Sequence, residues 1–77
     1  MNDNLNTLLQ LINAIRAKKQ RPALETLDDS MQLRGEIGFD SLDLAEFVVK
    51  IERDHDVDIF ADGILQSIGE VRTKLGL

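Results

Sequence analysis

A chain of 77 residues forms one domain at most and is too small to enclose a deep catalytic cleft. It contains no cysteine, which excludes disulfides, thiolate zinc sites and thiol nucleophiles and is ordinary for a reducing compartment such as the cytoplasm. The net charge of −5 disfavours binding to nucleic-acid phosphates and to anionic lipid.

The first predicted element is an amphipathic helix that begins after residues 2–4 and fades around residues 18–19. Asn2, Asp3 and Asn4 are good N-cap residues, and apolar side chains then recur at spacings of three and four: Leu5, Leu8, Leu9, Ile12 and Ile15. Pro22 disfavours a continuation of the helix. From Leu24 to Gly38 the apolar residues have no sustained period, which predicts a long, ordered loop pinned to the core.

A second helix is predicted from Ser41 to about Asp56, with an inward stripe of Leu44, Phe47, Val48 and Ile51. The stretch FADGILQ, residues 60–66, is predicted to supply one short helical turn. Ser67 to Glu70 forms a capping box that opens a final helix, with Ile68, Val71 and Leu75 inward and Gly76 at its end. No alternating strand pattern is present, so the prediction is all-α: a small four-helix bundle with three main helices, one short helix and a long loop between the first two.

The start of the second predicted helix holds a serine between two aspartates. If Asp40 is the N-cap, Asp43 falls at N3 and helps to satisfy the first-turn N–H groups, so the Ser41 hydroxyl at N1 is not required for capping. A phosphate ester on Ser41 would lie beside N–H groups that favour anions, although the two aspartates would oppose its charge. On local sequence alone, a helix cap without further function is the preferred interpretation.

The wider stretch GFDSLDLAEFVVKIE resembles the attachment motif of acyl carrier proteins, Gly-x-Asp-Ser-Leu followed by an acidic recognition helix. The order of the predicted elements is similar to that family over the whole chain, so residues 1–77 are expected to form one acyl carrier domain. The resemblance implies that Ser41 is esterified to phosphopantetheine from coenzyme A, and that the terminal thiol of this arm carries an acyl group as a thioester. It implies a non-catalytic, monomeric carrier for fatty-acid, polyketide or specialised lipid biosynthesis.

The same resemblance implies protein partners: a phosphopantetheinyl transferase, and acyl-transferring and chain-modifying enzymes with basic docking patches. The partner-binding positions of the family fall on Asp40, Leu42, Asp43, Ala45, Glu46, Val49 and Glu52. Positions 42, 45, 46, 49 and 52 lie at steps of three and four, which places them on a second helix face distinct from the inward stripe. Residues 24–62 carry twelve acids and three bases, and this excess favours a docking surface over a merely solvated face.

The family also implies an apolar space between the helices that shelters part of the acyl chain, lined here by Met31, Val48, Ile51, Ile59 and Ile68. The sequence departs from the family pattern at several positions. Lys50 and Arg53 add positive charge to the recognition helix, and the stretch between Ile59 and Ile68 is shorter than usual. These departures weaken an assignment to routine fatty-acid synthesis and leave the shape of the third helix open.

Metal and hydrolytic chemistry fit the sequence less well. Four aspartates from Asp54 to Asp62 occupy positions 1, 3, 5 and 9 of an EF-hand loop, but Ile59 stands where glycine is needed and Leu65 where a bidentate glutamate is needed. No metal site is therefore predicted. Serine hydrolysis lacks the second glycine of Gly-x-Ser-x-Gly, and the single histidine lies about four helical turns from Ser41, so no catalytic residue is predicted.

Two alternatives to an acyl carrier stay open. A peptidyl or aminoacyl carrier is the nearer relative, although the aspartate and leucine beside Ser41 resemble the acyl type more closely. An unmodified helical adaptor, whose acidic second helix only binds protein, is the alternative from another class. The N-terminus lacks the pattern of a signal peptide, so we expect the mature chain to start near Met1 and to remain in the cytoplasm, without insertion into a membrane.

Overall fold

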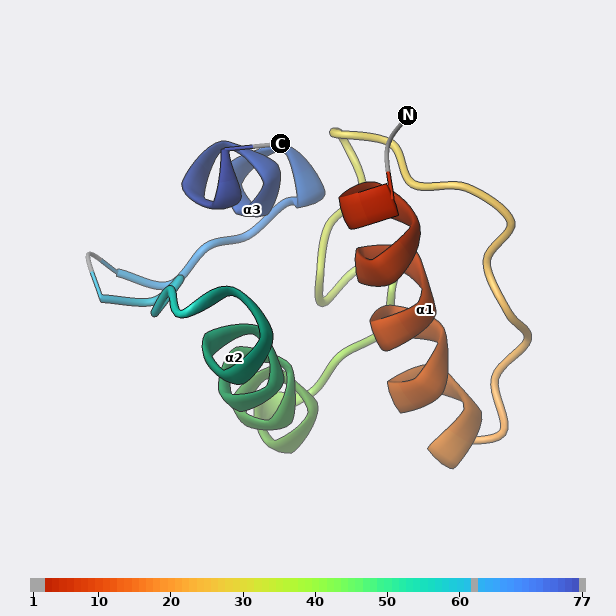
Figure 1. Cartoon of the computed structure of the whole chain (residues 1–77). Coiled ribbons are helices and arrows are strands. Elements are labelled where there is room, and N and C mark those ends of the chain that lie inside the picture. Colours follow the sequence, from red (N-terminus) through yellow and green to blue (C-terminus); the bar gives the residue numbers. More distant parts are fainter. Residues whose placement is uncertain (1–2, 62, 77) are drawn as a thin grey trace.

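The computed structural model describes residues 3–61 and 63–76, which form three helices: α1 (Asp3–Lys18), α2 (Ser41–His55) and α3 (Ile68–Leu75). A long loop connects α1 to α2, and a shorter connection leads from α2 to α3 (Figure 1). Within the described ranges there is no strand, and an isolated antiparallel bridge joins Gln32 to Ser67. The all-α prediction is confirmed, whereas the capping side chains expected of Asn2, Asp3 and Asn4 lie outside the described side chains.

One apolar core is shared by the three helices and the long loop. In α2 the predicted inward residues Leu44, Phe47 and Ile51 are buried, with Val48 packed beside them. The core also contains the following side chains from α1, the loops and α3: Leu8, Ile12, Ile15, Leu33, Ile37, Phe39, Ile59, Ile68 and Val71. Because residues of the long loop are among its members, the prediction of an ordered loop pinned to the core is confirmed.

A buried arginine fastens the long loop to α1. The Arg16 side chain donates from Nε and Nη2 to the Pro22 carbonyl, at 3.1 and 3.0 Å, and from Nη1 to the Ile37 carbonyl. Arg16 is 7% exposed, and a buried guanidinium is tolerated only when its N–H groups are bonded. These bonds hold the residues that precede α2 against α1. Sequence analysis did not identify Arg16, because a single arginine near a helix end is usually a surface residue.

The predicted short helix between α2 and α3 is not confirmed. Residues 59–61 form a turn, in which the Ala61 N–H donates to the Asp58 carbonyl at 3.2 Å, and the Gly63 N–H donates to the Phe60 carbonyl at 3.1 Å. Gly63 has a φ of +131°, a value that a right-handed helix does not contain. The described residues of this segment therefore form a chain of turns that returns to the core at Ile59 and Ile68.

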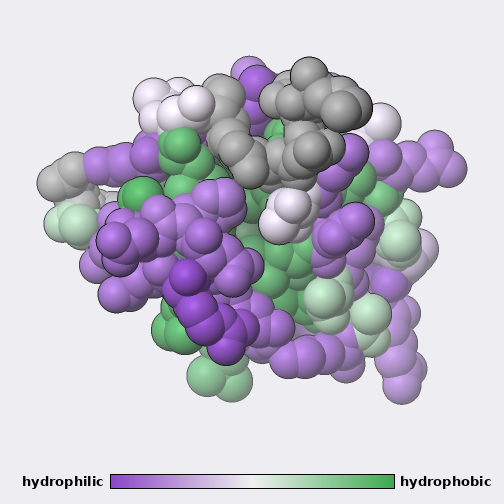
Figure 2. Space-filling model, viewed as in Figure 1, coloured by the Kyte–Doolittle hydropathy of each residue, from purple (hydrophilic) through white to green (hydrophobic). Residues whose placement is uncertain are grey.

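The surface separates into polar and apolar regions. In Figure 2 apolar residues occupy the centre of the visible face, between the polar side chains over α2 and those over α1. Among the residues that the structure describes, the large apolar side chains that are well exposed are Leu42, Val49 and Ile64. Within the described part of the chain, no helix has both the length and the apolar character that crossing a bilayer requires.

Candidate functional site

α2 begins with the capping box that the sequence predicts. Asp40 is the N-cap in an extended conformation, and its Oδ1 accepts from the Asp43 N–H at 2.9 Å. In return, Asp43 Oδ2 accepts from the Asp40 N–H at 3.0 Å. The two carboxylates thus satisfy each other's backbone donors. Ser41 occupies N1, its side chain is exposed, and its hydroxyl has no part in the capping box.

The residues just before α2 hold this helix start in place. Phe39 is 3% exposed and packs against Phe47 with their ring centroids 5.5 Å apart, so it belongs to the core. Gly38 has a φ of +85°, a conformation that residues with a Cβ rarely adopt. The chain therefore turns at Gly38, buries Phe39, and releases the next two side chains, Asp40 and Ser41, to the surface.

Lys19, the residue that follows α1, forms ion pairs with both capping carboxylates. Lys19 Nζ lies 2.8 Å from Asp43 Oδ2 and 3.5 Å from Asp40 Oδ2. The hydrogen bond to Asp43 raises the pKa of Lys19, with help from the Asp40 charge. The hydrogen bond from the Asp43 backbone N–H, together with the Lys19 charge, lowers the pKa of Asp40. The negative charge beside Ser41 is thus partly balanced, which reduces the repulsion that the two aspartates would exert on an anion there.

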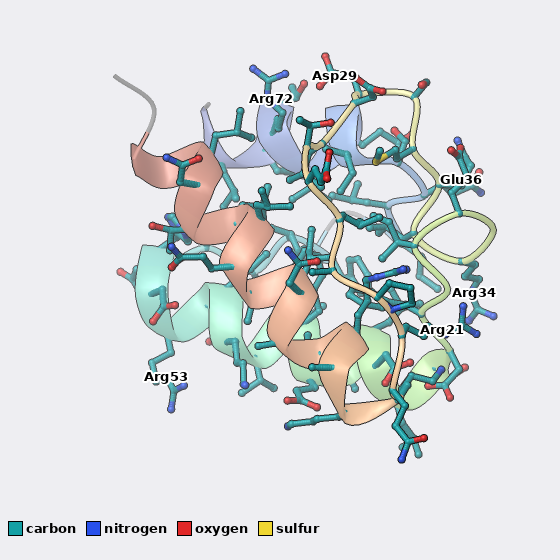
Figure 3. The ribbon with its side chains drawn as sticks, turned by 90° about the vertical axis from the view of Figure 1, so that its right-hand side faces the viewer. Arg21, Asp29, Arg34, Glu36, Arg53 and Arg72 are labelled. Atoms are coloured by element: carbon teal, nitrogen blue, oxygen red, sulfur yellow. The ribbon has the colours of Figure 1, made fainter. Side chains whose placement is uncertain are left out.

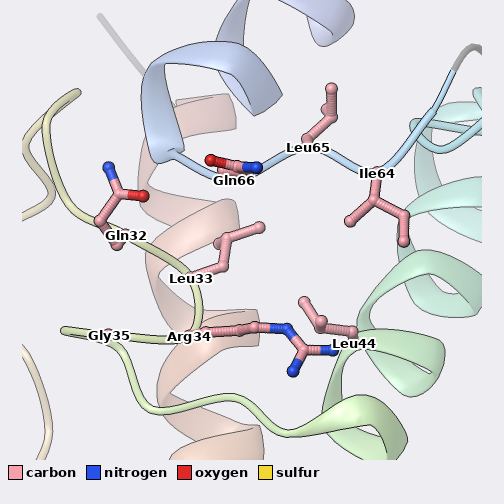
Figure 4. Close-up of a pocket in the computed structure, with 8 residues that line it drawn as sticks. All are labelled: Gln32, Leu33, Arg34, Gly35, Leu44, Ile64, Leu65 and Gln66. Carbon is pink, nitrogen blue, oxygen red and sulfur yellow. The ribbon is translucent and has the colours of Figure 1, made fainter.

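Arg34, in the long loop, contacts the serine directly. Its Nη2 donates to Ser41 Oγ at 3.2 Å. The Arg34 side chain also forms part of the wall of a pocket of about 290 Å³. Figure 4 shows the Arg34 guanidinium extending below Leu33 toward Leu44, and Ile64 lies above Leu44 in this view. Arg34 was not among the predicted site residues, although it is the one base in the sequence from Leu24 to Gly38, just before an acidic helix.

The pocket differs from the apolar space expected from the sequence. Ile51, Ile59 and Ile68, three of its five expected lining residues, have no exposed surface and belong to the packed core. The pocket that Arg34 lines lies between the long loop, Leu44 of α2 and the segment before α3, and its lining residues are Gln32, Leu33, Arg34, Gly35, Leu44, Ile64, Leu65 and Gln66. None of the residues expected to shelter an acyl chain is among them.

The predicted partner-binding residues fall into two groups in the structure. Leu42 and Val49 are 81% and 63% exposed, and Ala45 and Glu52 are exposed beside them on α2. Glu46 is instead engaged with cations of this chain, because it accepts from Lys18 and lies 3.1 Å from Lys50 Nζ. The hydrogen bond from Lys18 is the largest cause that lowers the pKa of Glu46, and the hydrogen bond from Lys50 lowers it further.

Asp40 and Asp43 belong to the second group as well, since Lys19 forms ion pairs with both carboxylates and each carboxylate accepts from the backbone N–H of the other residue. The face that remains open is therefore mainly apolar, and it includes Glu52, an exposed acid that forms no ion pair with the residues the structure describes. Of the four aspartates considered for calcium, Asp62 lies outside the described residues. Within the described ranges, no three acidic or histidine side chains gather in a way that could hold a metal ion.

A scan against protein-family models finds one described as "Phosphopantetheine attachment site", which matches residues 10–72. The matched span contains all of α2 with Ser41, the long loop and most of α1 and α3. A search of the curated proteins and a search of the solved structures found no match. The residues at the start of α2 fit such a group, because an exposed hydroxyl that the cap does not use lies next to a cationic side chain.

Proposed function

This chain belongs to the phosphopantetheine attachment family, and we propose that it is an acyl carrier protein with Ser41 as the residue that bears the arm. Members of the family carry covalently attached phosphopantetheine, so the chain is a carrier protein of this kind. The acyl type is supported by Asp40 and Leu42, which flank Ser41 as in acyl carriers. We assign the whole chain, residues 1–77, to one carrier domain that performs no catalysis itself.

The observation that carries the proposal is the spare hydroxyl at N1 of α2. Asp40 takes the capping role, so modification of Ser41 removes no hydrogen bond from the capping box. In the attachment step the Ser41 oxygen loses its proton and bonds to the phosphorus that bears the pantetheine, the pyrophosphate P–O bond of coenzyme A breaks, and the adenosine bisphosphate half leaves. When bound, the arm supplies a thiol that holds an acyl group as a thioester.

In this proposal, other residues of the chain hold Ser41 in place and shelter the cargo. The capping box and Lys19 fix the first turn of α2, so Ser41 is presented at a defined place on the surface. The pocket lined by Leu33, Leu44 and Ile64 shares a wall residue, Arg34, that also contacts this serine, which supports a role in sheltering apolar cargo, in place of the buried space expected from the sequence. A cargo held there would be protected from water until a partner draws it out.

The outer face of α2 is the proposed docking surface for the transferase and for acyl-transferring enzymes. Leu42, Ala45 and Val49 are exposed along it, and Glu52 adds an open carboxylate. An exposed apolar strip with an acidic border fits partners whose patches combine apolar and basic side chains. Glu46 and Asp43 contribute less direct charge than expected, since lysines of this chain already bind them.

The test is incubation of the protein with coenzyme A and a broad-specificity phosphopantetheinyl transferase, followed by intact-mass measurement. One arm is expected per chain. Trypsin then cuts after Arg34 and Lys50 and releases residues 35–50, in which Ser41 is the single hydroxyl side chain. The added mass is expected on that peptide, and an arm on any other peptide would refute the assignment of Ser41.

A second candidate is supported by the same exposed strip on α2. Leu42 and Val49 would serve an unmodified adaptor protein equally well, because their exposure does not depend on an arm. The two candidates differ in the first measurement. A folded wild-type chain that gains no mass with an active transferase would exclude the carrier and leave the adaptor.

A further inference from the structure

Arg34 is distinguished from the other bases around the attachment site by what it contacts. Of the three bases within residues 24–62, Lys50 is paired with Glu46, and Arg53 lies toward the far end of α2. Arg34 forms no ion pair with any described residue, and its single hydrogen bond goes to Ser41 Oγ. Its side chain is exposed, so the apolar core does not account for this position.

Lys19, another cation near the helix start, is already engaged by carboxylates of this chain. Lys19 binds both capping carboxylates and also donates to the Gly38 carbonyl at 3.3 Å. Moving Lys19 toward a new anion would therefore break contacts that stabilise the start of α2. Arg34 would break no ion pair with a described residue by turning to a new anion. Its planar guanidinium presents a fork of donors that suits the oxygens of a phosphate.

We propose that Arg34 is a positioning residue whose guanidinium binds the phosphate of the arm on Ser41, a step that rests on the proposed function. A phosphate esterified to Oγ brings its oxygens next to the atom that Arg34 Nη2 already reaches at 3.2 Å. The hydrogen bond to a neutral hydroxyl is then replaced by charge-assisted bonds to an anion, which are stronger. Arg34 thereby compensates for the negative charge that Asp40 and Asp43 place beside the ester.

The location of Arg34 gives this contact a second consequence. The same side chain lines the pocket together with Leu33, Leu44 and Ile64 (Figure 4). A phosphate held by Arg34 fixes the start of the arm at the edge of this pocket. The inference therefore links the attachment point to the pocket through one residue of the long loop.

The experiment compares wild type, Arg34→Gln and Arg53→Gln, each before and after conversion by the transferase. Arg53→Gln is the matched control because it removes the same charge from the same acidic segment, while Figure 3 shows Arg53 and Arg34 on opposite sides of the molecule. Both arginines are exposed, so both variants are expected to fold. Intact mass verifies the conversion, and denaturant titration gives the unfolding equilibrium constant of the apo and holo forms.

We expect attachment to lower the unfolding constant about threefold to fivefold more in wild type and Arg53→Gln than in Arg34→Gln at low salt, and this difference to vanish near 1 M salt. The ³¹P resonance of the arm should shift in Arg34→Gln alone. If wild type gains the arm and Arg34→Gln matches it in both measurements, the role of Arg34 is refuted while the carrier assignment stands. If wild type gains no arm, both fall.

Discussion

The two helix starts at α2 and α3 use the same capping device but place a serine differently within it. At α2 the N-cap is Asp40, and Ser41 at N1 is exposed and spare. At α3 the N-cap is Ser67 itself, whose Oγ accepts from the Glu70 N–H at 3.3 Å. The hydroxyl of a serine at a helix start thus either accepts the capping hydrogen bond, as in Ser67, or takes no part in the cap, as in Ser41. The residue that precedes Ser41 decides which, since an aspartate there takes over the capping role.

The two starts also differ in what supports them. Side chains from the end of α1 and the residue that follows it hold the approach to α2, with Arg16 on the Ile37 carbonyl and Lys19 on the capping carboxylates. Backbone hydrogen bonds from the long loop hold α3, including Ile68 N–H to the Met31 carbonyl and Gly69 N–H to the Asp29 carbonyl, both at 3.0 Å. Arg72 adds an ion pair to Asp29 at 2.6 Å (Figure 3). The attachment site therefore depends on a few identifiable side chains, which makes the comparison testable.

The largest expected effect separates the two serines by function. Ser41→Ala should abolish attachment of the arm, because no other hydroxyl occupies N1 of α2, and should change the free energy of unfolding by less than about 0.5 kcal/mol. Ser67→Ala should be modified completely under the same conditions. Intact mass after the transferase reaction measures both variants. Modification of Ser41→Ala, or its absence in folded Ser67→Ala, would contradict the distinction between the two helix starts.

The next effect tests the dependence of α2 on α1. Arg16→Met keeps most of the side-chain length but leaves the Pro22 and Ile37 carbonyls without their donors, so it should cost about 3 kcal/mol of the free energy of unfolding. Denaturant titration measures the loss. The control is Arg21→Gln, which changes an exposed arginine of the long loop and should cost less than about 0.5 kcal/mol of the free energy of unfolding. Equal stabilities of the two variants would show that the buried arginine does not hold the loop.

These contacts also mark how far the fold could be read from the sequence. α2 and α3 were predicted well because their stripes, caps and C-terminal glycine act within a few residues of one another. Gly76, for example, ends α3 with a φ of +74°, as expected. That the Ser41 hydroxyl is not needed for capping was likewise predicted from neighbouring residues, with Asp40 as the N-cap. The segment after α2 was predicted less well, because one short helical turn and a chain of turns have nearly the same local pattern, and the backbone of Gly63 decides between them.

The missed residues are those whose roles need the tertiary structure. Arg16 bonds to a carbonyl 21 positions away, and Lys19 reaches a carboxylate 24 positions away. No periodicity links such residues in advance. Glu46 was expected to face partners, yet it is bound by Lys18 across the α1–α2 contact, which only the packing of the two helices reveals. The contact of Arg34 with Ser41 is closer in sequence, since just six residues separate the two, but the conformation of the loop decides where the Arg34 side chain points.

A smaller effect measures the cost of the cap that Ser67 provides. Ser67→Ala removes the acceptor of the Glu70 N–H and should lower the free energy of unfolding by about 1 kcal/mol, while Ser67→Asp should retain most of it. Ser41→Ala is the matched comparison, since it removes the same hydroxyl one position later in an equivalent helix start. Denaturant titration of the three variants should place Ser67→Ala alone below wild type. An equal loss in Ser41→Ala would mean that its hydroxyl supports the helix after all.

The smallest effect is electrostatic and is confined to α2, because the cap of α3 is an uncharged hydroxyl. The folded-state pKa of Asp40 is lowered below 3.8, so its contribution to stability is complete above that pH and is lost as pH falls through the folded-state pKa. Lys19→Gln removes one cause of the lowering but leaves the larger one, the Asp43 N–H. In a ¹³C NMR titration of the side-chain carboxyl, the pKa of Asp40 should rise in Lys19→Gln and still lie below 3.8. A wild-type pKa at or above 3.8 would show that this carboxylate does not cap the helix that presents Ser41.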